Sequence, residues 1–243
     1  MVSKPPSVST SPSLVPAEIL AGSALDDRQP ATLTASVYAQ LRADILAGLL
    51  SPGAKLRADT LRKRFNTGSS PVREALNRLL AEGFVSLEEQ KGFRVAAVSR
   101  DDLIELVGAR VLIDSNAAAE SIRRFEASWE EGLVLALHHL SRTPREAFVA
   151  GSVTAWEVRH KNFHVALVAG CGSRWIRRIS EQLFDAAERY RLLALKWIPE
   201  PNELDEHRAI VEACLARDER RVAELIRSHY GQTFDAIAAS GLF

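Results

Sequence analysis

The stretch that decides the fold of the N-terminal part of the chain is NTGSSPVREALNRLLAEGFVSLEEQKGFRV, residues 66–95. Ser70 is a good helix N-cap, Pro71 suits the first helical position, and apolar residues then recur at helical spacing as far as Gly83. Two short apolar runs follow, separated by a polar turn at residues 88–92. We therefore expect a helix that leads directly into a small β-hairpin.

The residues before this stretch extend the pattern. An apolar stripe predicts one helix over residues 33–48, and a second short helix is expected over residues 58–65. Helix, helix, turn, helix and hairpin are the elements of a winged helix-turn-helix. Residues 31–99 carry 10 basic and 6 acidic side chains, a net charge of +4, which favours contact with phosphate. The alternative is a basic, solvated face on an ordinary helical domain.

Composition excludes several other classes of protein. The chain has 243 residues, a formal net charge of zero and 47% hydrophobic residues, which is typical of a globular protein. No apolar run is long enough to span a membrane, no signal peptide is recognisable, and the two cysteines cannot form a disulfide framework. Residues 1–30 hold five of the ten prolines and six serines, so we expect a disordered tail. These features predict a cytoplasmic protein with no membrane partner.

From residue 100 onward the sequence is helical in character. The breaks between apolar stripes place Pro144 and Pro201 in the first turns of helices and make Ser173 an N-cap. The predicted helices cover about residues 101–126, 128–141, 144–170, 173–197, 201–217 and 218–239. The fold class is thus mainly α, with the winged helix-turn-helix in residues 31–99 and an antiparallel helical bundle in residues 100–243.

Histidines occupy unusual positions in this bundle. Four of the six lie on inward-facing stripes of three predicted helices: His160, His164, His207 and His229. His160 and His164 are four residues apart, so their imidazoles point toward one place. A single buried histidine is usually a hydrogen-bonded core residue, but four would each need a partner. Imidazole is a good ligand for transition metals such as zinc or nickel, which makes these residues candidate metal ligands. His138 and His139 are adjacent and are read as surface residues.

Arg110 and Asp114 fall on the apolar stripe of the first bundle helix. One interpretation is a structural ion pair at i, i+4. The other is that Arg110 binds the carboxylate of a small ligand through its planar fork while Asp114 holds the guanidinium in place. A divalent ion held only by imidazoles keeps its positive charge, so a carboxylate is the ligand it would attract.

The chain resembles the GntR family of bacterial transcription regulators. The residues that carry this resemblance are Ser70-Pro71-Val72-Arg73-Glu74-Ala75-Leu76 and Lys91-Gly92-Phe93-Arg94-Val95. The helical remainder resembles the FCD ligand-binding domain of the FadR subfamily through Phe163-His164, Glu206-His207, Asp218 and His229. In metal-binding members three histidines and an Asp ligate the ion; here His160 stands where the Asp is usual. This implies either a site with four nitrogen ligands or, if His160 points away, a site with three histidines and a water molecule. Residues 169–173 and 183–191 are most similar to a branch that represses glutarate catabolism, which implies a C4 to C6 dicarboxylate such as glutarate as the effector.

The resemblance also implies DNA-contacting residues. Arg57 and Arg73 are expected near the phosphate backbone, because cations attract phosphate. Ser69 and Ser70 are expected at the start of the recognition helix, and Lys91 with Gly92 at the tip of the wing. Many members have Ser-Arg before the Pro-Val-Arg run, whereas this chain has Ser69-Ser70, so an arginine that reads guanine is missing.

Together these observations predict a homodimeric transcription regulator, a repressor by analogy with most relatives, that binds double-stranded operator DNA and is not an enzyme. A small carboxylate at a metal site would control it. Two alternatives remain: a DNA-binding protein with a metal-free bundle that only dimerises, and a metal-dependent hydrolase. The hydrolase is disfavoured because Lys161, and not a Glu, follows His160, so no general base is evident.

Overall fold

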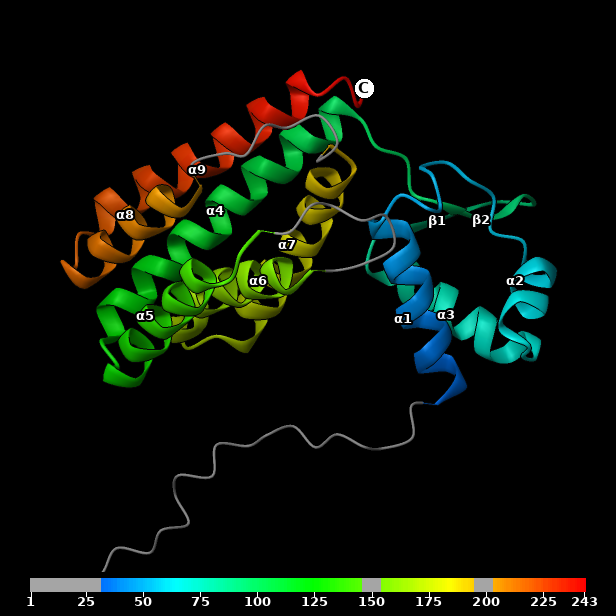
Figure 1. Ribbon diagram of the computed structural model, residues 1–243, viewed down its shortest axis with the longest axis horizontal. Coiled ribbons are helices and arrows are strands. Elements are labelled where there is room, and N and C mark those ends of the chain that lie inside the picture. Colours follow the sequence, from blue (N-terminus) through cyan, green and yellow to red (C-terminus); the bar gives the residue numbers. More distant parts are fainter. Residues whose placement is uncertain (1–31, 146–153, 195–202) are drawn as a thin grey trace, which may run out of the picture. The chain divides into compact units, whose positions relative to one another are not determined.

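The structure is a computed structural model that describes residues 32–145, 154–194 and 203–243. Most of these residues are helical, and one two-stranded sheet is present among them, as the sequence predicts. The predicted N-terminal tail, residues 1–30, and the predicted helix start at Pro201 lie outside the described residues. Figure 1 shows the order of the elements along the chain.

The first elements form the predicted winged helix-turn-helix. They are α1 (Leu33–Leu46), α2 (Ala58–Phe65), α3 (Ser69–Ala81), β1 (Val85–Glu88) and β2 (Gly92–Val95). The two strands are antiparallel and pair Val85 with Val95 and Glu88 with Gly92, which makes the tight wing. Buried residues from all three helices and the hairpin form a single core around Leu41 and Leu76. The hydrophobic pattern therefore decides this part of the fold.

The start of α3 differs from the prediction. Gly68, and not Ser70, is the N-cap, and no side chain caps the helix. Ser70 lies inside the first turn, where its hydroxyl donates to Glu74 Oε1 at 3.2 Å, and Pro71 therefore is not the first helical residue. Gly68 has the extended backbone conformation that is typical of an N-cap residue, and glycine is among the residues favoured at that position.

The bundle contains the helices that carry the histidines. They are α4 (Arg100–Arg124), α5 (Ala127–Arg142), α6 (Ala155–Val168), the short 3-10 turn η2 (Ala169–Cys171), α7 (Arg174–Ala194), α8 (Glu203–Leu215) and α9 (Glu219–Ala239). The long helices α4 and α9 lie side by side (Figure 1). They are antiparallel, because Arg123 at the end of α4 contacts Glu219 at the start of α9. Ser173 caps α7 as predicted, with its hydroxyl accepting from the amide of Ile176 at 3.3 Å.

The predicted helix start at Pro144 is wrong. Pro144 follows the end of α5 and is not helical, and α6 begins at Ala155. Thr154 is the N-cap of α6 and forms a reciprocal capping box with Glu157. This pair satisfies two of the free amide groups at the helix start, which a proline in the first turn does not do. His160 therefore lies in the second turn of a helix whose N-terminus is stabilised by a capping box.

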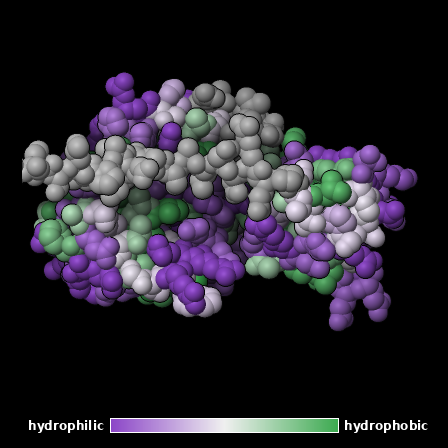
Figure 2. All heavy atoms as spheres, turned by 90° about the horizontal axis from the view of Figure 1, so that it is seen from below, coloured by the Kyte–Doolittle hydropathy of each residue, from purple (hydrophilic) through white to green (hydrophobic). Residues whose placement is uncertain are grey.

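Among the described helices, none combines the length and apolar character needed to cross a lipid bilayer. The core of the bundle is built from α4, α5, α6, α8 and α9 and contains Phe163, Ile210 and Ile226. Hydrophilic side chains project at the right-hand margin of the face drawn in Figure 2, where Figure 1 has α2 and α3. Arg62, Lys63 and Arg64 of α2 are all exposed.

Candidate metal centre and nucleic-acid interface

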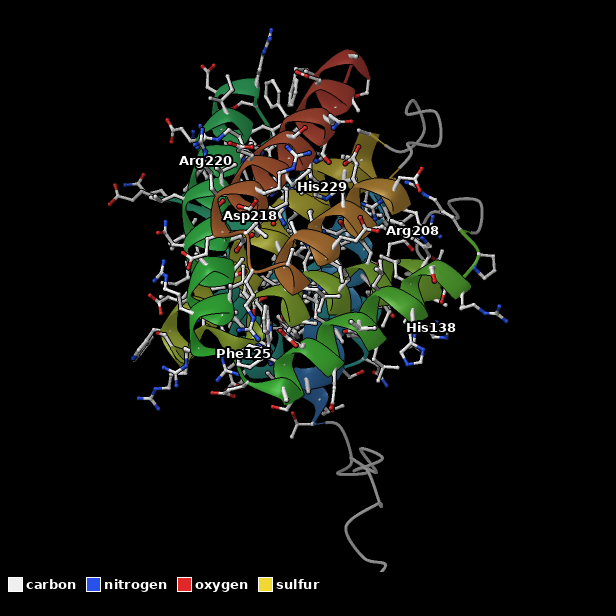
Figure 3. All side chains as sticks on the ribbon, turned by 90° about the vertical axis from the view of Figure 1, so that its left-hand side faces the viewer. Phe125, His138, Arg208, Asp218, Arg220 and His229 are labelled. Atoms are coloured by element: carbon white, nitrogen blue, oxygen red, sulfur yellow. The ribbon has the colours of Figure 1, made fainter. Side chains whose placement is uncertain are left out.

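The four predicted histidines converge in the interior of the bundle. His160 and His164 come from α6, His207 from α8 and His229 from α9, and each is at most 5% exposed. One nitrogen from each ring lies within 4.8 Å of the corresponding nitrogen of every other ring. Figure 3 shows His229 within the bundle, whereas His138 projects outward from α5. His139 is also exposed, so these two are surface residues as expected.

Several of these ring nitrogens have no hydrogen-bond partner. The Nε2 atoms of His160 and His164 face each other at 3.1 Å, whereas Nδ1 of His160 and both ring nitrogens of His207 are buried and unpartnered. A buried polar atom without a partner costs about 1–3 kcal/mol. A cation bound to the inward nitrogens would remove much of that cost. The residues therefore fit a transition metal with nitrogen ligands, and a ring nitrogen of His160 is one of the four that could hold it.

The protonation state of the rings suits metal binding. Burial is the main cause that lowers the pKa of all four imidazoles, and neighbouring positive charges lower it further. The pKa of His229 falls to about 3. The rings are consequently neutral near pH 7, and their lone pairs are available to a metal.

Two of the histidines are held by neighbours that orient them. Glu206 of α8 accepts a hydrogen bond from Nδ1 of His229 at 2.5 Å, which leaves Nε2 of His229 as the free ligand atom. The hydroxyl of Tyr230 lies 3.5 Å from Nδ1 of His164. The roles of Glu206 and Tyr230 were not predicted from the sequence. Their only signal was that each directly neighbours a predicted ligand in the chain.

Arg110 lies at the edge of the histidine cluster and is 7% exposed. Its Nε is 3.8 Å from Asp114 Oδ2, and its guanidinium lies 3.9 Å from the centre of the Tyr230 ring. The predicted pair with Asp114 is present but long, because Asp114 accepts shorter hydrogen bonds of 2.6 Å from Ser180 and from Tyr230. Nε and Nη2 of Arg110 make no hydrogen bond. The guanidinium is thus fixed in place while its donors stay available.

The space beside Arg110 is small in this arrangement. The cavity has a volume of about 20 Å³, and its polar lining residues include Arg110, His160, His164 and His229. Its apolar lining residues include Leu103 and Ile237. Such a volume holds roughly one water molecule. A ligand of several carbon atoms requires the surrounding helices to move apart.

A second group of buried charges, which the sequence pattern did not predict, lies beside the cluster. Arg191 pairs with Glu188 through two contacts, of which the one to Nε is 2.8 Å, and lies 3.6 Å from Glu157. All three residues are buried, each at most 8% exposed. Glu188 and Arg191 are three residues apart on α7, a spacing that alone predicts only a surface pair.

The predicted DNA-contacting residues are at the surface of the first elements. Arg57, Ser69, Ser70, Arg73 and Lys91 are exposed, and Gly92 is partly exposed. Ser69, Ser70 and Arg73 lie together in the first turns of α3, whereas Lys91 and Gly92 lie at the hairpin tip. Arg73 forms no ion pair with any described residue, so a structural pairing does not explain it. Lys91 is 3.6 Å from Glu88, and Gly92 has a φ of 82°, which favours glycine.

Comparison with known proteins defines the class of this molecule. Residues 33–95 match the family described as "Bacterial regulatory proteins, gntR family", and residues 105–232 match the FCD domain. The protein is a DNA-binding transcription regulator and not an enzyme. It belongs to the GntR family and carries an FCD domain after its winged helix-turn-helix. Regulators of this kind bind operator DNA and small-molecule effectors and are typically dimers.

Individual relatives agree with this assignment. The chain is 36% identical to the HTH-type transcriptional repressor GlaR of Escherichia coli (strain K12) over 79% of this chain and 90% of that protein. It is 34% identical to the HTH-type transcriptional regulator BphR of Paraburkholderia xenovorans (strain LB400) over 87% of each. The solved structure of E. coli McbR/YncC has the same fold, with a TM-score of 0.68 at 20% identity over 86% of this chain and 98% of that one.

Proposed function

We propose that the protein is a cytoplasmic repressor that binds operator DNA as a homodimer and leaves it when a small carboxylate binds beside a divalent transition metal, zinc or nickel, in the bundle. The observation that carries the metal part is the convergence of four buried imidazoles from three helices within 4.8 Å. The similar protein GlaR is named a repressor, which supports repression and not activation as the effect of this protein on transcription. The sequence resemblance supports a C4 to C6 dicarboxylate such as glutarate as the effector.

The roles of the residues follow from their contacts. His160, His164, His207 and His229 would hold the metal, which when bound supplies a positive charge that attracts a carboxylate. Arg110 would bind the same carboxylate through its unpartnered Nε and Nη2. Asp114 positions Arg110 and also accepts from Tyr230. The anion site and the metal site are therefore connected through one buried network.

Helix α7 offers a route from this site to the DNA-binding part. Ala187 and Glu188 line the cavity, and the next residue, Arg189, is buried and donates from Nη2 to the carbonyl oxygens of Ala96 and Ala97 at 2.5 and 2.8 Å. Residues 96–99 connect the wing to α4. Because the cavity is too small for a dicarboxylate, a ligand must favour a more open arrangement of α7. A shift of α7 would then move residues 96–99, the segment that links the wing to α4.

Metal analysis of the protein without an affinity tag tests the proposed site. We expect one zinc or nickel ion per chain in the wild type, and none in the variant His164→Ala/His229→Ala, because half of the nitrogen ligands are removed. The variant His138→Ala/His139→Ala is the matched control, since it removes two exposed histidines and should bind metal normally. Elemental analysis after dialysis against the metal gives the stoichiometry.

The outcome separates this proposal from its alternative. If the wild type binds no metal although it binds operator DNA, the bundle is a metal-free dimerisation domain and the four histidines are core residues. If the control loses metal as well, the ion is held at the surface and the buried cluster is not the site.

A further inference from the structure

A groove of about 760 Å³ lies between the winged helix-turn-helix and the bundle. One wall is formed by α1 and the end of α3, and the other by α6 and α7. Charged side chains line both walls, among them Arg42 on α1, Lys161 on α6 and Asp185 on α7. The metal site, the carboxylate site and the DNA-contacting surface do not use these three residues.

Asp185 joins the two walls because each of its carboxylate oxygens has a partner. Oδ2 accepts from Nη2 of Arg42 at 2.7 Å, and Oδ1 accepts from Nζ of Lys161 at 2.7 Å. The side chains of Arg42 and Asp185 are each 22% exposed, so water screens this ion pair less than a pair on the open surface. Among the ion pairs of the described residues, it is the one that links the winged helix-turn-helix to the bundle.

The bundle side of this bridge adjoins the histidine cluster. Lys161 directly follows His160 in α6, and Asp185 directly follows Phe184 in α7. The ring of Phe184 lies 5.6 Å from the ring of His160, and Phe184 lines the small cavity beside Arg110. The contact between α6 and α7 thus has packed rings on its inner side and an ion pair on its outer side. A change in the spacing of these two helices therefore acts on both.

The other side of the bridge is attached to the recognition helix. The Arg42 guanidinium lies 5.0 Å from the centre of the Phe84 ring, and Phe84 is buried in the core of the winged helix-turn-helix. Tyr38, one turn before Arg42 on α1, donates from its hydroxyl to Glu82 at the end of α3 at 2.6 Å. Because these contacts hold α1 and α3 together, a displacement of Arg42 is passed on to α3.

We infer that Asp185 is a positioning residue for operator binding. It fixes the orientation of the winged helix-turn-helix through Arg42, while Lys161 holds Asp185 against α6. Without this bridge the winged helix-turn-helix would sample several orientations, and the affinity for the operator would fall in proportion to the fraction that fits it. The inference rests on the proposed function in one respect: a ligand that separates α6 from α7 would disturb the same bridge and so favour release of the operator.

Fluorescence anisotropy of the full chain with an operator fragment tests this role. Asp185→Asn should raise the dissociation constant by about fivefold, the effect of losing one partly shielded ion pair. This direction opposes the general electrostatic effect, because removal of a negative charge from a protein strengthens its attraction to phosphate. Asp185→Glu keeps the charge and should retain most of the wild-type affinity.

Glu181→Gln is the matched control for Asp185→Asn. Glu181 is an exposed acid one turn earlier on α7, lines the same groove and forms no ion pair with any described residue. Its replacement changes the net charge by the same amount and should not weaken operator binding. Metal content and the melting temperature should stay at their wild-type values in both variants.

A double-mutant cycle separates positioning from a general effect on structure. Arg42→Gln should weaken operator binding about as much as Asp185→Asn, and the double variant should be no weaker than either, because both changes remove the same contact. Lys161→Gln combined with Asp185→Asn tests the other half of the bridge in the same way.

Two results would overturn the inference: an Asp185→Asn variant that binds the operator as tightly as Glu181→Gln, or losses in Arg42→Gln and Asp185→Asn that add in the double variant. Failure of the proposed function would appear elsewhere, in a wild type that binds no metal or that keeps the operator whichever carboxylate is added.

Discussion

At the scale of single residues, the distinctive feature is Arg110, a buried guanidinium that keeps two donors unused. In most proteins a buried arginine is fully paired. Here Asp114 is already bonded by Ser180 and Tyr230, so its contact with Arg110 is only a 3.8 Å ion pair. The contacts with Asp114 and Tyr230 hold the Arg110 guanidinium in position, while its Nε and Nη2 remain free to donate hydrogen bonds. A residue that binds a carboxylate needs this combination.

Arg110→Ala should abolish most of the response to the effector. Hydrogen bonds to charged groups contribute about 1.5–3 kcal/mol, so we expect the affinity for glutarate or the best dicarboxylate to fall by roughly 10- to 150-fold. Thermal shift and calorimetric titrations of metal-loaded protein with mono- and dicarboxylates measure this.

The control for this variant is Arg123→Ala on the same helix, whose side chain is exposed and paired with Glu120 and Glu219. It should leave the effector response intact. An Arg110→Ala variant that binds metal and responds to the carboxylate like wild type would remove Arg110 from the site.

At the scale of elements, the start of α3 decides how DNA is approached. Gly68 leaves the first-turn amides uncapped, and the exposed Ser69, Ser70 and Arg73 surround them. The positive end of a helix dipole with free amide groups is a good phosphate site. The missing side-chain cap is thus consistent with a surface reserved for a nucleic acid.

Arg73→Ala should weaken operator binding and reduce its dependence on salt. Removal of one phosphate contact lowers the slope of log K against log salt concentration by about 0.9 per chain, because one fewer counterion is released. Fluorescence anisotropy with an operator fragment between low and moderate salt gives this slope. Arg178→Ala, an exposed arginine of α7, is the matched control and should change neither affinity nor slope. Equal slopes for wild type and Arg73→Ala would mean that Arg73 does not touch phosphate.

At the scale of the whole molecule, four neutral imidazoles in one core couple stability to pH. Their pKa values are lowered by burial in the folded, metal-free protein, whereas in the unfolded chain they return to about 6.5. Below that pH the unfolded chain binds protons that the folded chain does not. Stability is therefore full above pH 6.5 and is lost as the pH falls.

Metal-free protein should consequently unfold more easily at pH 5.5 than at pH 7.5. The free energy of unfolding falls by at most about 1.4 kcal/mol per histidine per pH unit below 6.5. Urea unfolding at the two pH values measures the difference. The control variant His138→Ala/His139→Ala should show the same difference in stability, because those two rings are exposed. A wild type that is equally stable at both pH values would show that the buried rings bind protons in the folded protein as readily as in the unfolded chain.

The sequence alone determined the elements and the candidate ligands. Turn chemistry and apolar spacing in residues 66–95 predicted the helix and hairpin, because these depend on neighbouring residues. The helix starts were less reliable: Ser70 and Pro144 were misplaced, since Gly68 and the Thr154 capping box decided those positions. The inward spacing of His160 and His164 was sufficient to suggest a shared site.

Only the tertiary structure decided which residues meet. His207 and His229 reach the cluster because α8 and α9 pack against each other and the bundle, and no local pattern specifies that packing. The hydrogen bonds from Ser180 and Tyr230 to Asp114, and from His229 to Glu206, join residues 66, 116 and 23 positions apart in sequence. Periodicity reports which side of a helix is buried but not what it is buried against, because that depends on how several helices share one core.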